Sequence, residues 1–211
     1  KLVVLIRTRQ SRYIHPFTGA RPGGWGWTDL SGSVPDGDDT SAALIALYEL
    51  DPGRVTGEVV AGLKWLLKLM NSDGGMPTFC RGWGVLPFDR SCPDISAHAL
   101  RAFMLWKEHV SDGLKPQLEV GASNLRDFLI NSRDIDGVWT PLWFGDQHAP
   151  DHHNRVYGTA VVLESLVGLS WGKYITGKAL DWLVKAQNPD GGWGGEPGAP
   201  STIEMSGKAI S

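Results

Sequence analysis

Two kinds of hydrophobic pattern alternate along the 211 residues of this chain. In the first kind, apolar residues recur at helical spacing with charged residues between them, which predicts an amphipathic helix. This kind covers residues 65–70, 125–131 and 182–187. The second kind is apolar and rich in small residues on nearly every face, which is typical of a helix buried on all sides. It covers residues 39–50, 93–106 and 156–169. The pattern therefore predicts outer and inner helices in alternation.

A glycine-containing turn follows each amphipathic segment, so the chain carries an internal repeat. The copies are WLLKLMNSDGGM (65–76), LRDFLINSRDIDGVW (125–139) and WLVKAQNPDGGW (182–193), and a split copy has its helix at 2–10 and its turn at 22–27. Glycine after a helix supplies the left-handed residue that ends it. In the last copy we expect the Gln187 amide to donate to carbonyls at the end of the next helix, with the Trp193 ring covering that contact.

The composition agrees with a repeat of helices and glycine turns, because ten Trp and 27 Gly suit tight turns that large flat side chains hold in place. We predict an all-α fold of the α-α toroid type, in which inner helices line an axis and outer helices surround them. About four helix pairs fit into the sequence, the last inner helix starting within 201–211. A closed toroid needs more pairs than these, so we expect residues 1–211 to form one partial toroid domain. The alternative is an open helical solenoid.

Charge and hydropathy exclude several classes of protein. The net charge of −3, without a basic tract, argues against nucleic acid binding. No apolar run approaches the length of about 18 residues that a membrane-spanning helix needs. The opening KLVVLIRTRQ is too short and too charged for a secretory signal, and its lack of Met suggests that the chain begins inside a longer one. Two cysteines, Cys80 and Cys92, are too few for a disulfide framework, which favours the cytoplasm.

The sequence DGDDT (36–40) crowds three carboxylates, Asp36, Asp38 and Asp39, directly before an inner helix. Neighbouring carboxylates disfavour a further negative charge, so one of them is expected to stay protonated. The partial positive charge of a helix N-terminus favours the anion that remains after such an acid gives up its proton. A cluster of helix-capping residues or a weak Ca²⁺ loop is the alternative interpretation of this triplet.

With these motifs, the chain resembles the squalene-hopene cyclase and oxidosqualene cyclase family, the class II triterpene cyclases. One motif behind the resemblance is the Gln-x-x-x-Gly-x-Trp repeat, which is complete at Gln187, Gly191 and Trp193. The copy at 70–76 is degenerate, because Met replaces both Gln and Trp. The other is DGDDT. The resemblance covers almost the whole chain. It implies the acid-bearing barrel of an enzyme that protonates an alkene or epoxide of a linear isoprenoid such as squalene, without a metal or other cofactor.

The resemblance also assigns roles to the residues of the acid cluster. Asp38 is implied as the proton donor, flanked by Asp36 and Asp39. His98 lies four residues after Asp94 on one face of an inner helix, as in family members where such a histidine hydrogen-bonds the acid and the aspartate orients the histidine. The alternative for His98 is a buried structural role.

Aromatic residues are implied as the lining of the substrate cavity. Tyr157 matches a tyrosine near the acid that organises the water returning the proton, and Trp143 matches an aromatic residue beside the same site. Trp27 and Phe79 match cavity-lining positions, where aromatic π faces stabilise a carbocation without attacking it. Plain core packing is the alternative for these aromatic residues.

Other parts of the resemblance concern partners and location. Family members bind one membrane leaflet, so we expect a cytoplasmic protein or one peripheral on the cytoplasmic membrane, and the apolar segment 83–88 is a candidate border of the substrate entrance. A second barrel domain or a homo-oligomer is expected to complete the enzyme. The sequence of 201–211 turns polar where the family has a long apolar helix, which puts closure of the barrel in question.

Three alternatives remain open. The chain is either a cyclase, a catalytically inactive toroid that serves as a structural or interaction module, or a relative of the protein prenyltransferase β-subunits. The last class needs a zinc site with Asp, Cys and His ligands, and no Asp-x-Cys pair exists here. The loop 144–155 gathers His148, Asp151, His152 and His153, which are metal-binding residue types, but their spacing fits no zinc motif and predicts a solvated loop.

Overall fold

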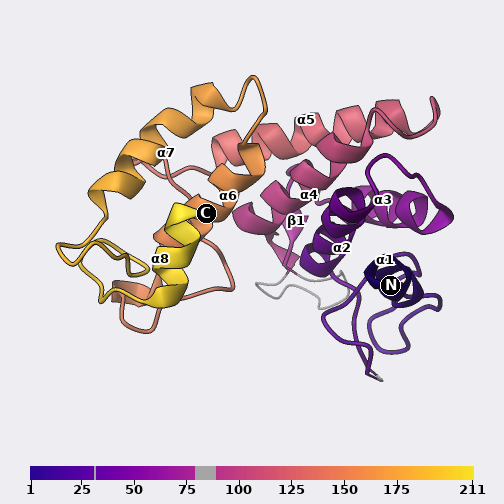
Figure 1. Ribbon diagram of the computed structural model, residues 1–211, viewed down its shortest axis with the longest axis horizontal. Helices are drawn as coiled ribbons and strands as arrows, with labels where there is room; N and C mark the ends of the chain where they lie inside the picture. The colour runs from indigo at the N-terminus through magenta and orange to yellow at the C-terminus, as the bar shows by residue number, and fades with distance from the viewer. Residues whose placement is uncertain (31, 79–88) are drawn as a thin grey trace. The chain divides into compact units, whose positions relative to one another are not determined.

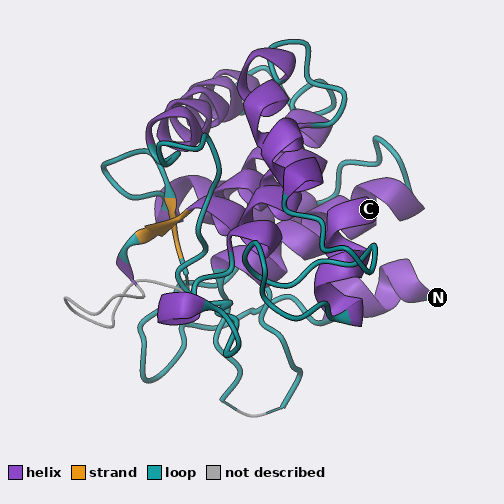
Figure 2. Ribbon diagram, turned by 90° about the vertical axis from the view of Figure 1, so that its left-hand side faces the viewer, coloured by secondary structure: helices purple, strands orange, loops and turns teal. Residues whose placement is uncertain are grey.

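The computed structural model describes residues 1–30, 32–78 and 89–211. Figure 2 shows helices joined by long loops, with a single short pair of strands among the described residues. Contacts divide the chain into two compact units, residues 1–128 (unit 1) and 129–211 (unit 2), and each unit is described by itself.

Unit 1 alternates outer and inner helices in the order that the hydrophobic pattern predicts (Figure 1). Its elements are α1 (Leu2–Thr8), α2 (Gly37–Leu50), α3 (Gly57–Leu69), β1 (Met76–Pro77), β2 (Ser91–Cys92), α4 (Pro93–Trp106) and α5 (Lys115–Asn131), whose last turn enters unit 2. The strands pair antiparallel, with Met76 opposite Cys92 and Pro77 opposite Ser91. Sequence analysis did not predict these strands, because two residues are too short for an alternating pattern.

The inner helices α2 and α4 pack against each other and form the core of unit 1. Leu44, Leu47, Phe103 and Trp106 are fully buried between them. The Trp106 indole N–H donates to the Leu44 carbonyl at 2.9 Å, which satisfies its only polar group inside the core. The outer helix α3 is amphipathic instead, with one buried apolar face and exposed lysines.

Unit 2 repeats this arrangement with η2 (Pro150–His152), α6 (Arg155–Leu166), α7 (Lys173–Lys185) and α8 (Ile203–Ile210). The inner helix α6 is buried along most of its length and contacts both α7 and α8. The outer helix α7 buries only Ile175, Ala179 and Leu183, one turn apart on a single face. The prediction of an all-α fold with the helix alternation of an incomplete α-α toroid is therefore confirmed.

Each repeat turn closes with the same backbone hydrogen bonds. The amide of Asn188 donates to the Gly192 carbonyl at 2.9 Å, and the amide of Gly191 donates back to Asn188 at 2.9 Å. Gly191 has φ of +84°, a left-handed conformation that strains any residue with a Cβ. The Trp193 indole then donates to the Leu183 carbonyl at 2.8 Å and so caps the end of α7. The Trp193 side chain therefore caps the C-terminal end of α7, in addition to the expected role of its ring in covering the glutamine contact.

The glutamine contact differs between copies. Gln10 donates both to the Gly23 carbonyl of its own turn and to the Glu58 carbonyl in the first turn of α3, each at 2.8 Å, so it joins two outer helices. Gln187 donates to the Gly191 carbonyl at 2.7 Å, within its own turn. The contact to a neighbouring helix that we expected at Gln187 is thus found at Gln10.

A hydroxyl group fixes each turn to the inner helix that follows it. The residue at the tryptophan position donates its backbone N–H to a Ser or Thr in the first turns of that helix. The pairs are Trp25 with Thr40, Met76 with Ser96, Trp139 with Thr159 and Trp193 with Ser206, at 2.9 to 3.2 Å. Each bond sets the depth and rotation of an inner helix at its N-terminus, where the acid cluster lies in α2.

Candidate functional site

The acid cluster is built on the first turn of α2. Asp36 is the N-cap residue, and its Oδ1 accepts the Asp39 backbone N–H at 2.7 Å. The capping interpretation is thus correct for Asp36. Asp38 and Asp39 follow in the first turn, where the unpaired N–H groups of the helix favour negative charge. Capping accounts for one of the three carboxyl groups in this turn, that of Asp36.

The inner helix α4 brings His98 to this cluster. His98 Nδ1 lies 2.6 Å from Asp38 Oδ1, a short hydrogen bond between residues 60 positions apart in sequence. Both side chains are partly exposed, with 25% of His98 and 37% of Asp38 accessible to solvent. The predicted pairing of Asp38 with His98 is thus present in the geometry. Asp38 Oδ2 takes no part in this hydrogen bond.

Burial acts on the carboxyl groups beside Asp38. The pKa of Asp36 is raised from 3.8 to about 9, mainly by loss of solvent and also by the hydrogen bond and negative charge of Asp39. Burial also raises the pKa of Asp39, with the charge of Asp38 as a further cause. The sequence argument relied on repulsion between the carboxylates, whereas the largest cause in the structure is desolvation. Asp36 therefore holds a proton at neutral pH.

In the described structure, Asp94 makes its side-chain hydrogen bond to Cys92. Its Oδ1 accepts a hydrogen bond from the Cys92 thiol at 2.6 Å, and both side chains are buried. Side chains on a helix lean toward its N-terminus, so Asp94 in the first turn of α4 points back to Cys92 and not forward to His98. Burial raises the pKa of Asp94, and the charge of Asp38 raises it further. That Asp94 orients His98 therefore stays a prediction.

Sequence analysis missed Cys92 as a member of this site. It considered the cysteine only as a zinc ligand and as a sign of the redox compartment. The signal was available in the repeat, because Cys92 pairs with Met76 as Asp36 pairs with Trp25. Cys92 thus lies at the same position of α4 that Asp36 occupies in α2.

The aromatic candidates differ in their surroundings. Trp27, in the loop before α2, is 83% exposed. In unit 2, Tyr157 lies in the first turn of α6, its backbone N–H donates to Asn154 Oδ1 at 3.2 Å, and its ring centroid lies 4.9 Å from that of Phe144. Trp143 is half exposed in the preceding loop. Phe79, like the segment 83–88, lies outside the described residues. Their role as a cavity lining stays a prediction.

The histidine-rich loop does not gather metal ligands. Within the described ranges, no group of three His, Cys, Asp or Glu side chains is placed to hold a metal ion. Asp151 and His152 lie in the short 3₁₀ helix η2, and their φ values of +54° and +56° are left-handed. The expectation of a solvated loop agrees with the exposure of residues 150–153.

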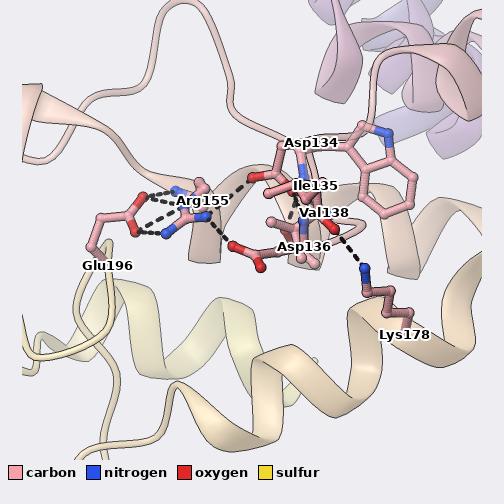
Figure 3. Close-up of polar contacts among 9 residues, drawn as sticks. Asp134, Ile135, Asp136, Val138, Arg155, Lys178 and Glu196 are labelled. Atoms are coloured by element: carbon pink, nitrogen blue, oxygen red, sulfur yellow. Dashed lines mark hydrogen bonds and ion pairs between the residues drawn. The ribbon is translucent and has the colours of Figure 1, made fainter.

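A second polar cluster lies in unit 2 and centres on Arg155 at the start of α6. Figure 3 shows its guanidinium between Glu196 on one side and Asp134 and Asp136 on the other. Arg155 Nε and Nη2 reach Glu196 Oε2 at 2.9 and 2.8 Å, and Nη1 reaches the two aspartates at 3.1 and 2.9 Å. These bonds, with Glu196 first, raise the pKa of Arg155 further above its ordinary value. Sequence analysis assigned no role to this cluster.

Comparisons with known proteins identify the family of the chain. The model of the squalene-hopene cyclase C-terminal domain matches residues 14–211. The chain is similar to the terpene cyclase-glycosyl transferase fusion protein fsoA of Humicola fuscoatra, with 31% identity over 82% of the chain and 14% of that protein. It is also similar to squalene hopane cyclase afumA of Aspergillus fumigatus, with 26% identity over 82% of the chain and 28% of that protein.

Solved structures show the same fold. The chain is similar to the type II terpene cyclase MstE from Scytonema, in the complex of its R337A variant with geranylgeranyl dihydroxybenzoate as substrate. The TM-score is 0.62, with 19% identity over 99% of this chain and 54% of that one.

The chain spans less than a third of the length of the curated relatives named above. No helix among the described residues is long and apolar enough to cross a membrane. The family match nevertheless extends over nearly the whole printed sequence and includes both the acid cluster and the repeat turns. The chain therefore belongs to the squalene-hopene cyclase family and is a class II terpene cyclase-like domain.

Proposed function

We propose that this chain is the acid-bearing part of an enzyme that cyclises a linear isoprenoid, with Asp38 as the general acid. The observation that carries the proposal is the 2.6 Å hydrogen bond between His98 Nδ1 and Asp38 Oδ1 inside a cluster of three carboxyl groups. With Asp38 protonated on Oδ2, a donated hydrogen bond from His98 to Oδ1 stabilises the carboxylate that forms when the proton leaves. A hydrogen bond to the charged form makes the group a stronger acid.

The first step needs only this proton. The π electrons of a terminal alkene take the proton from Asp38 Oδ2, which leaves a carbocation on the substrate and a carboxylate on the enzyme. The next double bond of the folded chain attacks the cation, and each attack forms one C–C bond and moves the charge onward. Loss of a proton or addition of water ends the sequence. No redox change occurs, so the reaction is an isomerisation or a hydration.

The neighbours of Asp38 favour this step. Because Asp36 keeps its proton at neutral pH, the new carboxylate of Asp38 meets one negative charge fewer. The first turn of α2 offers its partial positive charge to the same anion. We assign Asp39 and Asp94 as flanking groups that set the charge of the site. Tyr157 is proposed to organise the water that returns the proton to the acid.

The proposed substrate is a linear isoprenoid such as squalene. MstE, with the same fold, is solved with geranylgeranyl dihydroxybenzoate, so this fold accommodates an isoprenoid chain with a different end group. Trp27, Phe79 and Trp143 are proposed to supply π faces along the path of the cation. Activity is proposed for the complete protein, since the chain covers only part of its relatives.

The test is Asp38→Asn in the full-length protein, with squalene and geranylgeranyl-bearing substrates and product detection by gas chromatography. Asparagine keeps the size of the side chain but cannot donate this proton, so we expect activity to fall at least about 10³-fold. Asp29→Asn is the matched control, because Asp29 is an exposed partner of Arg9 and its loss should leave activity unchanged. Unchanged product formation in the Asp38 variant would contradict the assignment of the acid. A wild-type protein that converts no isoprenoid would favour an inactive interaction module instead.

A further inference from the structure

The N-termini of the two inner helices of unit 1 lie close together. A Cβ added to Gly37, at the start of α2, would meet Cγ2 of Ile95 in the first turn of α4 at 3.2 Å. The charge of Asp38 therefore reaches Asp94, and it is one cause of the raised pKa of that carboxyl group. A residue that fixes the state of Asp94 thus acts on the acid site.

The backbone of Cys92 is held firmly beside this site. It pairs with Met76 between the two strands. Its carbonyl accepts the Ser96 hydroxyl at 2.7 Å, and the Ser96 oxygen accepts the Met76 backbone N–H at 2.9 Å. Pro93 follows directly as the first residue of α4, and its ring restricts the backbone there. The position of the Cys92 thiol therefore follows from a rigid backbone.

The thiol reaches Asp94 from this position. Cys92 and Asp94 are 0 and 2% exposed, and Sγ lies 2.6 Å from Oδ1. An ionised carboxylate only accepts hydrogen bonds, so the thiol is the donor to that form. Burial raises the pKa of Asp94, the hydrogen bond from Cys92 lowers it, and the charge of Asp38 raises it again. The thiol therefore opposes the effect of burial on Asp94.

The surroundings of Asp94 supply one charge of each sign. Within the described part of the chain, these are Asp38 from α2, which raises the pKa of Asp94, and His98 from α4 itself, which lowers it. The other elements packed against α4 are the two strands and α3. β1 has no titratable side chain, and β2 supplies the thiol. The lysines of α3 face solvent, and its Glu58 interacts with Arg7.

We propose that Cys92 is a positioning residue of the acid site, whose thiol fixes the orientation of Asp94 and favours its ionised form. The negative charge of Asp94 then favours the imidazolium form of His98, which supports the acid through its hydrogen bond to Asp38. Because Cys92 is fully buried, it acts through Asp94 and not on the substrate. This inference rests on the proposed function, since it needs Asp38 as the general acid.

Infrared difference spectroscopy of the full-length protein tests the effect on Asp94 directly. The C=O band of the protonated carboxyl group is assigned by its loss in Asp94→Asn, and its pH midpoint is then compared between variants. In Cys92→Ala we expect the midpoint to rise by about one pH unit, because a hydrogen bond to the ionised form is removed. Serine keeps a donor, so the midpoint of Cys92→Ser should stay close to that of the wild type. An unchanged midpoint in Cys92→Ala, or equal shifts in both variants, would overturn the proposal.

Steady-state kinetics test the effect on the reaction. Cys92→Ala should lower kcat about tenfold and leave KM within about twofold, since an interaction away from the substrate is lost. Cys92→Ser should restore most of kcat. Cys92→Val removes the donor but fills the space, and it replaces alanine in both measurements if circular dichroism shows that Cys92→Ala is unfolded. A kcat that stays at the wild-type value without the thiol would overturn the role of Cys92 in the acid site.

Ser165→Ala is the matched control, because it also removes one buried hydrogen-bonding atom from an inner helix. The Ser165 hydroxyl on α6 donates to the Val161 carbonyl at 2.9 Å. This variant should change neither the infrared midpoint nor kcat. The infrared measurement needs no turnover, so it tests the bond from Cys92 to Asp94 even in a protein that converts no isoprenoid. Failure of this inference and failure of the proposed function are therefore distinguishable.

Discussion

Each unit gathers three carboxyl groups near one basic side chain, but the two clusters are built differently. In unit 2, Arg155 uses three of its nitrogens to reach Glu196, Asp134 and Asp136, so every carboxylate has a charged partner. In unit 1, the one carboxyl group that His98 hydrogen-bonds among the described residues is that of Asp38. Arginine offers five N–H donors in a planar fork, whereas an imidazole offers at most two in opposite directions.

The consequence is a different distribution of protons. In unit 1 the carboxyl groups without a cation, Asp36 and Asp39, have raised pKa values because burial penalises their charged forms. In unit 2 the shift falls on Arg155, whose charged form is favoured by its partners. Buried carboxyl groups without a charged partner therefore tend to stay protonated, as in unit 1. Carboxylates that share an arginine stay charged and link separate parts of the chain, as in unit 2. The first suits acid chemistry and the second suits structure.

Among the tests of this contrast, the largest expected effect comes from removing His98, the basic partner of the acid. His98→Ala in the full-length protein should lower product formation by about 10²- to 10³-fold, because Asp38 loses the donor that stabilises its carboxylate. His98 is partly exposed, so the unfolding midpoint should change little. His98→Gln, which can still donate a hydrogen bond, should recover part of the activity. Equal activity in wild type and His98→Ala would show that His98 is a packing residue.

The next effect tests the structural cluster. Arg155→Met should lower the free energy of unfolding by about 3 kcal/mol, since it leaves Glu196 buried and all three carboxylates without their partner. Urea unfolding monitored by tryptophan fluorescence measures this change. Lys208→Met is the control, because Lys208 and Glu164 form an exposed pair at 3.9 Å whose loss should cost less than about 0.5 kcal/mol. A similarly small loss for Arg155→Met would remove the contrast between the two clusters.

The smallest effect concerns the proton on Asp36. Its pKa is about 9 in the folded protein against 3.8 as the ordinary value, so the folded state binds more protons between these pH values. Stability should therefore fall as pH rises from about 4 to about 9. Asp36→Asn keeps an oxygen for the cap but has no proton to lose, so its curve should be flatter. Between these pH values we expect the stability of the variant relative to the wild type to rise by on the order of 1 kcal/mol per pH unit.

Thermal unfolding of both proteins at pH 5 and pH 8 measures this difference. The comparison of slopes is needed because the substitution also alters the cap energy by an amount that does not depend on pH. If the two stability curves run parallel, Asp36 is ionised in the folded protein and the charge contrast between the clusters is wrong.

The sequence by itself determined the helix alternation and the repeat turns. Apolar residues at helical spacing have to be buried, and glycine after a helix ends it, so both follow from local chemistry. The pairing of Asp38 with His98 came from the family resemblance, which carries tertiary information that spacing alone lacks. Asp36 as the cap residue followed from its place directly before an apolar helix.

Only the tertiary structure decided which partner each polar group meets. Asp94 bonds Cys92 and not His98, because the direction of a helical side chain depends on its place in the turn. Arg155 meets Glu196 across 41 positions of sequence, and Thr40 meets the backbone of Trp25 across a loop. The raised pKa of Asp36 required knowledge of its burial. Local propensity acts over a few residues, whereas burial and long-range pairing depend on how the whole unit packs.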